Sequence, residues 1–189
     1  MPNTLAKQDH STAEHSSGII INDFLKENFS RIKKGARILC LGENEGHASV
    51  FLAKNGFDVT EVNASRRDMD RAHALAQQEH VTVKSSFMEL SELAVKPLTW
   101  DAIVSIWCHP VTSVRRDLHK NCVNGLARGG LFLYEAYSQG QLKYRTGGPG
   151  DVSFLGTLPK VKEELKGLNL LLAQEITRPI HEGQGRQGT

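Results

Sequence analysis

The chain has 189 residues, which is enough for one domain with a sizeable core and too few for two ordinary ones. Its 23 Lys and Arg residues nearly balance 21 Asp and Glu residues, so neither a nucleic-acid partner nor an acidic membrane surface is indicated. Three cysteines, Cys40, Cys108 and Cys122, have no C-x-x-C spacing and predict no disulfide framework and no metal site. With a polar N-terminus and no apolar run of bilayer length, these features lead us to expect a cytoplasmic protein.

Helical and strand patterns alternate along the chain. Residues 1–17 are polar and lack periodicity, so we expect a flexible arm there. A first helix is predicted to begin at the N-cap Asn22 and to stop at Gly35. The other predicted helices cover residues 47–55, 69–76, 111–122 and 159–167. The predicted strands are residues 36–41, 57–62, 81–84, 101–106, 131–137 and 168–176.

This alternation predicts an α/β fold, with a Rossmann-like, mostly parallel sheet and helices on both faces. We expect the domain to span residues 18–183 and to be followed by a flexible tail, 184–189. In such sheets ligands bind beyond the carboxyl ends of the strands. The loops after Leu41, Val62, Val83 and Ile106 are therefore expected to converge on one site.

The loop LGENEGHAS, residues 41–49, joins a predicted strand to a predicted helix. It lacks two of the three glycines of the dinucleotide fingerprint, and it is not a P-loop. Glu43 and Glu45 would repel a pyrophosphate at the helix N-terminus and would favour a cationic adenosyl ligand such as S-adenosylmethionine. Gly42 and Gly46 would let the backbone approach that ligand. Alternatively, the glutamates only stabilise the first helical turn, by roughly 0.3–1 kcal/mol each.

Four stretches together resemble class I S-adenosylmethionine-dependent methyltransferases, within a small bacterial subgroup related to tellurite-resistance and thiopurine-type methyltransferases. They are INDFL, ILCLGENEGHASVFLAKNGFDVTEVNAS, WDAIVSIWCH and GLARGGLFLYEAYSQGQLKYRTGGP, and the resemblance runs from about Gly18 to about Gly183. The second stretch is similar to the class-wide strand, glycine loop, helix and strand signature. QLKYRTGGP is the part that indicates the subgroup.

The resemblance implies S-adenosylmethionine as cofactor and gives roles to particular residues. Asn63 would bind the ribose, Ala64 would lie against the adenine, and Ser86 with Phe87 would meet the adenine amino group. Without the resemblance, Asn63 and Ser86 fit ordinary turn chemistry. The implied cofactor-binding residues are Leu41, Gly42, Glu43, Gly46, Asn63, Ala64, Ser86, Phe87, Ile106 and Trp107.

Several positions depart from the family pattern. Asn63 replaces an acidic residue, and its neutral hydrogen bonds are expected to weaken ribose binding by about 1–2 kcal/mol. Ser86 replaces the usual Asp or Asn, and Asn44 replaces the middle glycine of the loop. Cys40 and His47 differ from the pattern as well. These departures keep open a second hypothesis, a non-catalytic or weakly cofactor-binding module with the same fold.

The segment WCHP follows the fourth strand of the family pattern, where the wall between cofactor and acceptor is expected. His109 is the candidate catalytic residue, as an acceptor contact or a general base, although a surface or helix-capping role is somewhat more common for a histidine in such a place. Cys108 is expected to be a buried apolar thiol. Arg115 and Arg116 fit a solvated helix face better than an anionic acceptor site.

Tyr144 and Arg145 belong to a glycine-rich turn that the resemblance implies is a lid over the acceptor. The turn also reads as an ordinary loop. Family analogy gives a small-molecule acceptor, a thiol or a chalcogen oxyanion, and a monomer or homodimer is expected. The residues after Ile180 show no apolar alternation, so we expect the sheet to lack the final strand of this class. A dinucleotide-dependent oxidoreductase is the third hypothesis, which the glycine spacing disfavours.

Overall fold

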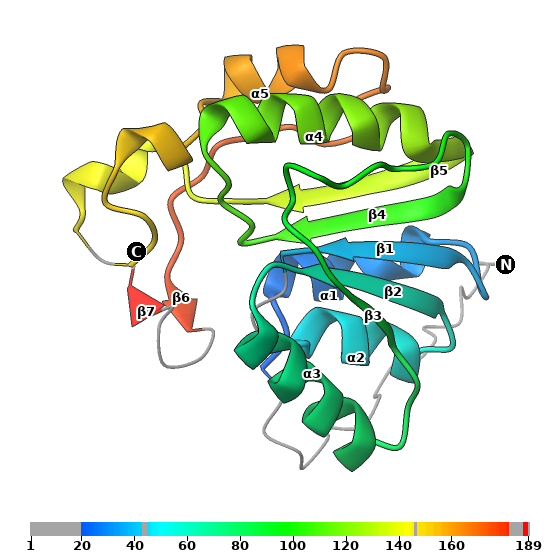
Figure 1. Cartoon of the computed structure of the whole chain (residues 1–189). Helices are drawn as coiled ribbons and strands as arrows, with labels where there is room; N and C mark the ends of the chain where they lie inside the picture. The colour runs from blue at the N-terminus through cyan, green and yellow to red at the C-terminus, as the bar shows by residue number, and fades with distance from the viewer. Residues whose placement is uncertain (1–19, 43–44, 146, 182–186, 189) are drawn as a thin grey trace, which may run out of the picture.

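A five-stranded, fully parallel sheet in the order β3-β2-β1-β4-β5 forms the centre of the computed structural model (Figure 1). The structure describes residues 20–42, 45–145, 147–181 and 187–188. The predicted arm, residues 1–17, and most of the predicted tail lie outside them. The strands are β1 (Arg37–Leu41), β2 (Asp58–Asn63), β3 (Lys84–Phe87), β4 (Trp100–Ile106) and β5 (Leu126–Glu135).

Helices cover both faces of this sheet, as the sequence predicted. They are α1 (Asp23–Asn28), α2 (His47–Lys54), α3 (Arg66–Gln78), α4 (Thr112–Gly125) and α5 (Leu158–Glu164), with 3-10 helices η1 (Phe29–Arg31), η2 (Gln139–Lys143) and η3 (Val152–Phe154). Two-residue strands β6 (Ile180–His181) and β7 (Gln187–Gly188) form a separate antiparallel pair. In Figure 1, α4 and α5 lie on one side of the sheet, and α1, α2 and α3 lie on the other.

Alternate side chains of the apolar central strands supply two cores. On β1, Ile38 and Cys40 pack into the cluster that includes Leu25 of α1 and Leu52 of α2. Leu39 packs into the opposite cluster, which includes Leu118 of α4. This two-sided burial explains why β1 and β4 are continuous apolar runs rather than alternating ones.

Local capping fixes two helix starts. The Asn22 side chain accepts a 2.8 Å hydrogen bond from the Leu25 N–H, which confirms Asn22 as the N-cap of α1. The helix is shorter than predicted, because α1 gives way to the 3-10 helix η1 at Phe29. Ser65 caps α3 by accepting from the Asp68 N–H at 3.2 Å, and it thereby sets the turn that follows β2.

Strand β3 lies three residues later than the sequence predicted. Pairing with β2 sets its register, with Val62 opposite Ser86 and Asn63 opposite Phe87. Ser86 and Phe87 are thus the last residues of the strand and do not belong to the loop beyond it. The loop that reaches the end of the sheet begins at Met88, whose N–H donates to the Asn63 carbonyl.

The predicted strand at residues 168–176 is wrong. In the described part of the chain this segment pairs with no strand, and β5 pairs only with β4. The exposed fractions of Leu170, Leu171 and Leu172 are 49%, 69% and 52%. An apolar run becomes a strand only when a neighbouring strand satisfies its backbone groups, and none does so here. The sheet accordingly has five strands.

The chain contacts the sheet again at Arg178 and Ile180. Arg178 donates to both carboxylate oxygens of Glu135 at the end of β5, at 3.0 and 3.2 Å. Ile180 follows it into the core. None of the helices in the described residues has the length and apolar character needed to cross a membrane.

Candidate functional site

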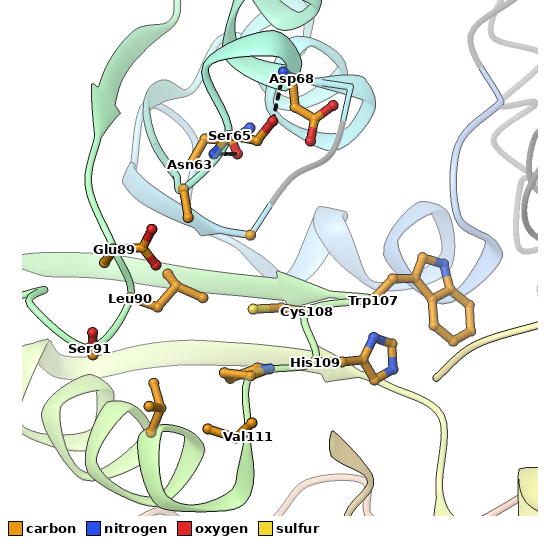
Figure 2. A pocket seen from close by; sticks show the side chains of 14 residues that line it. Asn63, Ser65, Asp68, Glu89, Leu90, Ser91, Trp107, Cys108, His109 and Val111 are labelled. Atoms are coloured by element: carbon orange, nitrogen blue, oxygen red, sulfur yellow. Dashed lines mark hydrogen bonds between the residues drawn. The ribbon is translucent and has the colours of Figure 1, made fainter. Parts of the chain in front are cut away.

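A cavity of about 400 Å³ opens beyond the carboxyl ends of β1, β2, β3 and β4 (Figure 2). Loops at all four strand ends contribute to it, which confirms the predicted convergence of the loops after Leu41, Val62 and Ile106; the third loop begins at Met88 and not after Val83 as predicted. Its volume is within the range of small-molecule sites. It is lined by Gly42, Asn63, Ala64, Ser65, Asp68, Glu89, Leu90, Ser91, Trp107, Cys108, His109, Pro110, Val111 and Val114.

The two glycines of the first loop serve different purposes. Gly42 has a φ of +66°, and a Cβ there would lie 2.5 Å from the Cys108 Sγ, so this position lets the β1 and β4 ends approach each other. Gly46 has a φ of +77° at the N-cap of α2, and a Cβ there would lie 2.5 Å from the Cβ of Ala72. Gly46 therefore serves helix packing and does not line the cavity. Glu43 lies outside the described residues.

Asn63 ends β2 at the cavity wall. It is 4% exposed, and its Oδ1 accepts a 3.1 Å hydrogen bond from the Ser65 N–H. Figure 2 shows Asn63, Ser65 and Asp68 joined by this bond and by the capping bond of α3. Asn63 therefore stabilises the turn after β2, which is the alternative role that the sequence allowed for it. Ala64 is exposed and lines the cavity between them.

The acidic character of the cavity comes from residues that the sequence did not indicate. Asp68 and Glu89 both line it, and in the described part of the chain neither forms an ion pair. Glu45, in contrast, lies within 2.9 Å of Arg71 and 3.5 Å of His47, so its charge is already paired. Two unpaired carboxylates favour a cationic ligand over a phosphate.

The segment after β4 forms the opposite wall. Trp107 is 6% exposed with a φ of +56°, and its N–H donates to the Glu135 carbonyl at 2.8 Å. Figure 2 shows the Trp107 and His109 rings directed to one side and the Cys108 thiol to the other, so the adjacent Cys108 and His109 do not form a pair. Ile106 is buried in the core and does not line the cavity.

His109 is held by a backbone group of the loop after β5. Its Nε2 accepts a 3.0 Å hydrogen bond from the Tyr137 N–H. The Tyr137 ring also lies against the rings of His109 and Trp107, with centroid distances of 5.6 and 4.6 Å. The sequence singled out His109, but it missed Tyr137, because residues 28 positions apart meet only after β4 and β5 pair.

Several other candidates lie away from the cavity. Ser86 and Phe87 are in β3, and the guanidinium of Arg66 lies 4.2 Å from the Phe87 ring centroid. Leu41 is 1% exposed, in the core beneath the cavity. Glu89, Leu90 and Ser91, in the loop after β3, line the cavity in place of Ser86 and Phe87.

Tyr144 and Arg145 lie near a second, smaller cavity of about 300 Å³ that shares no lining residue with the first. Arg145 lines it together with the glycines of the TGGP turn, whereas Tyr144 does not. The Tyr144 hydroxyl lies 3.5 Å from the Thr177 Oγ1. The structure therefore keeps these two residues together but apart from His109.

Arg115 does not lie on a solvated helix face, so that expectation is wrong. It is 2% exposed and donates two 3.0 Å hydrogen bonds to the Glu164 carboxylate of α5. His119 lies one turn further along α4, and its Nδ1 is 2.8 Å from the same carboxylate. Arg116, the next residue, is exposed as predicted.

A family model described as tellurite resistance protein TehB matches residues 7–126, more than half of the chain. No curated protein sequence matches the chain. Among solved structures, TehB from Haemophilus influenzae is 19% identical with a TM-score of 0.67, over 89% of this chain and 58% of that one. A TehB-like SAM-dependent methyltransferase from Corynebacterium glutamicum is 17% identical with a TM-score of 0.59, over 79% and 73%.

At these identities the solved structures establish the fold, and this chain spans less than two thirds of the Haemophilus protein. The cavity fits S-adenosylmethionine, because its two carboxylates, which form no ion pair within the described residues, suit a sulfonium and an ammonium. The family match, the parallel sheet and the cavity agree with one another. The chain belongs to the TehB family of tellurite resistance proteins, and it has the fold of S-adenosylmethionine-dependent methyltransferases.

Proposed function

We propose that the chain binds S-adenosylmethionine in the cavity beyond β1 to β4 and transfers its methyl group to a small-molecule acceptor. The observation that carries this proposal is that four strand-end loops line one cavity, together with two carboxylates that form no ion pair in the part of the chain that the structure describes. By family analogy the acceptor is a thiol or a chalcogen oxyanion. The acceptor's lone pair would form a bond to the methyl carbon while the carbon–sulfur bond breaks and its electron pair stays on sulfur. A thiol acceptor would first release its proton to solvent and react as the thiolate.

The protein's own contribution is to bind and orient the reactants, since a methyl displacement depends mainly on approach geometry. Asn63 and Ala64 would hold the adenosine half, and Gly42 and Trp107 would contain the methionine half. Of the other residues implied by the resemblance, Leu41 and Ile106 would act only through the strands they end. The carboxylates of Asp68 and Glu89 would offset the cofactor's positive charge.

The acceptor would enter on the His109 side of the cavity. Tyr144 and Arg145 would act as part of a lid, because the turn that follows them contacts Tyr137, whose ring lies against that of His109. Gly148 of that turn packs so closely on the Tyr137 ring that a Cβ would come within 2.4 Å of it. This contact links the second cavity to the wall of the first.

A cavity-filling variant tests the location of the cofactor. Ala64 is exposed and lines the cavity, so Ala64→Trp should leave folding intact and lower affinity for S-adenosylmethionine at least about tenfold. Ala94 is exposed and lies outside the cavity, so Ala94→Trp is the matched control and should bind as the unmodified protein does. Equilibrium dialysis with labelled S-adenosylmethionine measures both. Equal affinities of the two variants would contradict this placement.

The second candidate function is a weakly binding or non-catalytic module. It is favoured by the Oδ1 of Asn63, which already accepts from the Ser65 N–H. An aspartate could keep that bond with one oxygen and accept a ribose hydroxyl with the other. Asn63→Asp should then tighten S-adenosylmethionine binding by about tenfold. Unchanged affinity would show that the amide does not weaken ribose recognition.

A further inference from the structure

Three aromatic rings meet where the loops after β4 and β5 come together. Trp107 and Tyr137 have centroids 4.6 Å apart, Tyr137 and His109 are 5.6 Å apart, and Trp107 and His109 are 6.4 Å apart. The angles between their planes are only 18–30°. Trp107 and Tyr137 are 6% and 9% exposed. Trp107 and His109 of this cluster line the cavity, and the Tyr137 ring packs behind them in the core.

One hydrogen bond in the cluster determines the protonation state of His109. The Tyr137 backbone N–H donates to the His109 Nε2 at 3.0 Å. A backbone N–H can only donate, so the Nε2 that accepts this bond carries no proton. A neutral imidazole must then carry its single proton on Nδ1. Whatever group Nδ1 meets, it meets as a hydrogen-bond donor.

The Tyr137 N–H is itself held in place from two directions. The loop after β4 is tied to the end of β5 by the Trp107 N–H, which donates to the Glu135 carbonyl at 2.8 Å. On the other side, Gly148 packs flat against the Tyr137 ring, where a Cβ would lie 2.4–2.9 Å from three ring atoms. The donor to Nε2 therefore has little freedom to move away.

We propose that His109 works as a neutral hydrogen-bond donor through Nδ1, and that Tyr137 is the positioning residue that fixes this tautomer. The proposal rests on the proposed function only for the identity of the ligand, since His109 lines the cavity where the acceptor would enter. In this tautomer Nδ1 is already protonated and Nε2 is engaged, so His109 orients the acceptor and does not remove a proton from it.

The tautomer can be measured without cofactor or acceptor. Nitrogen-15 spectra of the full chain at neutral pH, with His109 assigned by difference against His109→Gln, report which ring nitrogen is protonated. We expect the Nδ1–H form to exceed the Nε2–H form about fivefold or more, because only the former accepts from Tyr137. A predominant Nε2–H form, or a doubly protonated ring, would overturn the proposal.

Two glycine variants test the positioning role. Gly148→Ala places a methyl group against the Tyr137 ring, whereas a Cβ at Gly150 meets nothing within 4 Å. The first variant should reduce the tautomer excess at least about twofold, and Gly150→Ala should leave it unchanged. The same excess in both folded variants would refute positioning through Tyr137. If Gly148→Ala does not fold, the spectrum of the unmodified protein still decides the tautomer.

The proposed function and this inference fail in separate ways. Calorimetric titration with S-adenosylmethionine tests the function and does not depend on the state of His109. A protein that binds the cofactor but shows the Nε2–H tautomer would keep the function and overturn the inference. A protein that shows the Nδ1–H tautomer but does not bind the cofactor would keep the inference and overturn the proposed function.

Discussion

Replacing Glu164 should destabilise the fold more than any other single charge removal in α5. Its carboxylate is 7% exposed and accepts two hydrogen bonds from Arg115, which is 2% exposed. Burial alone would lower the pKa of the Arg115 guanidinium, but the hydrogen bonds and charge of Glu164 raise it. In the described residues the Arg115 Nη1 has no hydrogen-bond partner, so Glu164 is the group that offsets this buried charge.

Glu164→Gln keeps the shape of the side chain and removes its charge. Breaking a buried ion pair by removing one partner typically costs about 3–5 kcal/mol, because the other charge stays buried. We expect a loss of this size in the free energy of unfolding, measured by urea denaturation with linear extrapolation. Because the exposed surface is unchanged, the slope of the transition should stay constant while its midpoint falls.

The neighbouring Glu163 provides the control. It is on the same helix and 78% exposed, and its carboxylate lies 3.8 Å from the Lys166 Nζ. Glu163→Gln should change the unfolding free energy by less than about 1 kcal/mol. If the Glu164→Gln and Glu163→Gln variants unfold at the same urea concentration, the buried cluster does not stabilise the fold in the way argued.

Three further predictions concern the interior and the first loop. Burial lowers the pKa of His119, although Glu164 raises it, so the unfolded chain takes up this proton first. The unfolding free energy should therefore fall as pH drops below about 6.5, and His119→Gln should flatten that slope in urea titrations from pH 7.5 to 5. Burial, with a smaller effect of Cys108, raises the pKa of the Cys122 thiol to about 12. A disulfide reagent at pH 8 should therefore not label this thiol before the protein unfolds. Labelling at the rate of free cysteine would contradict its burial. Gly42→Ala should lower the melting temperature, because it adds about 1–2 kcal/mol of backbone strain and a steric clash with Cys108. Gly150→Ala is the control and should leave the melting temperature unchanged. Equal melting temperatures of the two variants would refute the tight packing at Gly42.

The sequence predicted the parallel α/β sheet and the end of it at which the cavity lies. Continuous apolar runs such as residues 36–41 and 101–106 are buried on both faces, and that pattern identified β1 and β4 before any contact was known. The sequence did not predict the register of β3. Pairing with β2 selects residues 84–87 over the more apolar residues 81–83. The run at 168–176 has strand composition, but a strand also needs a partner, which local composition does not reveal.

Site chemistry was predicted where it depends on position along one strand and was missed where it depends on packing. Gly42, Asn63 and His109 lie at or within three residues of strand ends, and all three line the cavity. Asp68 enters the cavity through the first turn of α3, and the register of β3 brings Glu89 there. No spacing in the sequence indicated that these two carboxylates would line the same cavity as Trp107 and His109.

Calorimetric titration of the unmodified protein with S-adenosylmethionine, S-adenosylhomocysteine and NAD tests the central claim most directly. A cavity lined by the carboxylates of Asp68 and Glu89 should bind S-adenosylmethionine with a Kd below about 1 mM, and should give no binding heat with the pyrophosphate of NAD. S-adenosylhomocysteine should bind to the same site and compete. The absence of binding heat at millimolar S-adenosylmethionine would contradict the account. Binding of NAD alone would show that the carboxylates do not exclude a pyrophosphate.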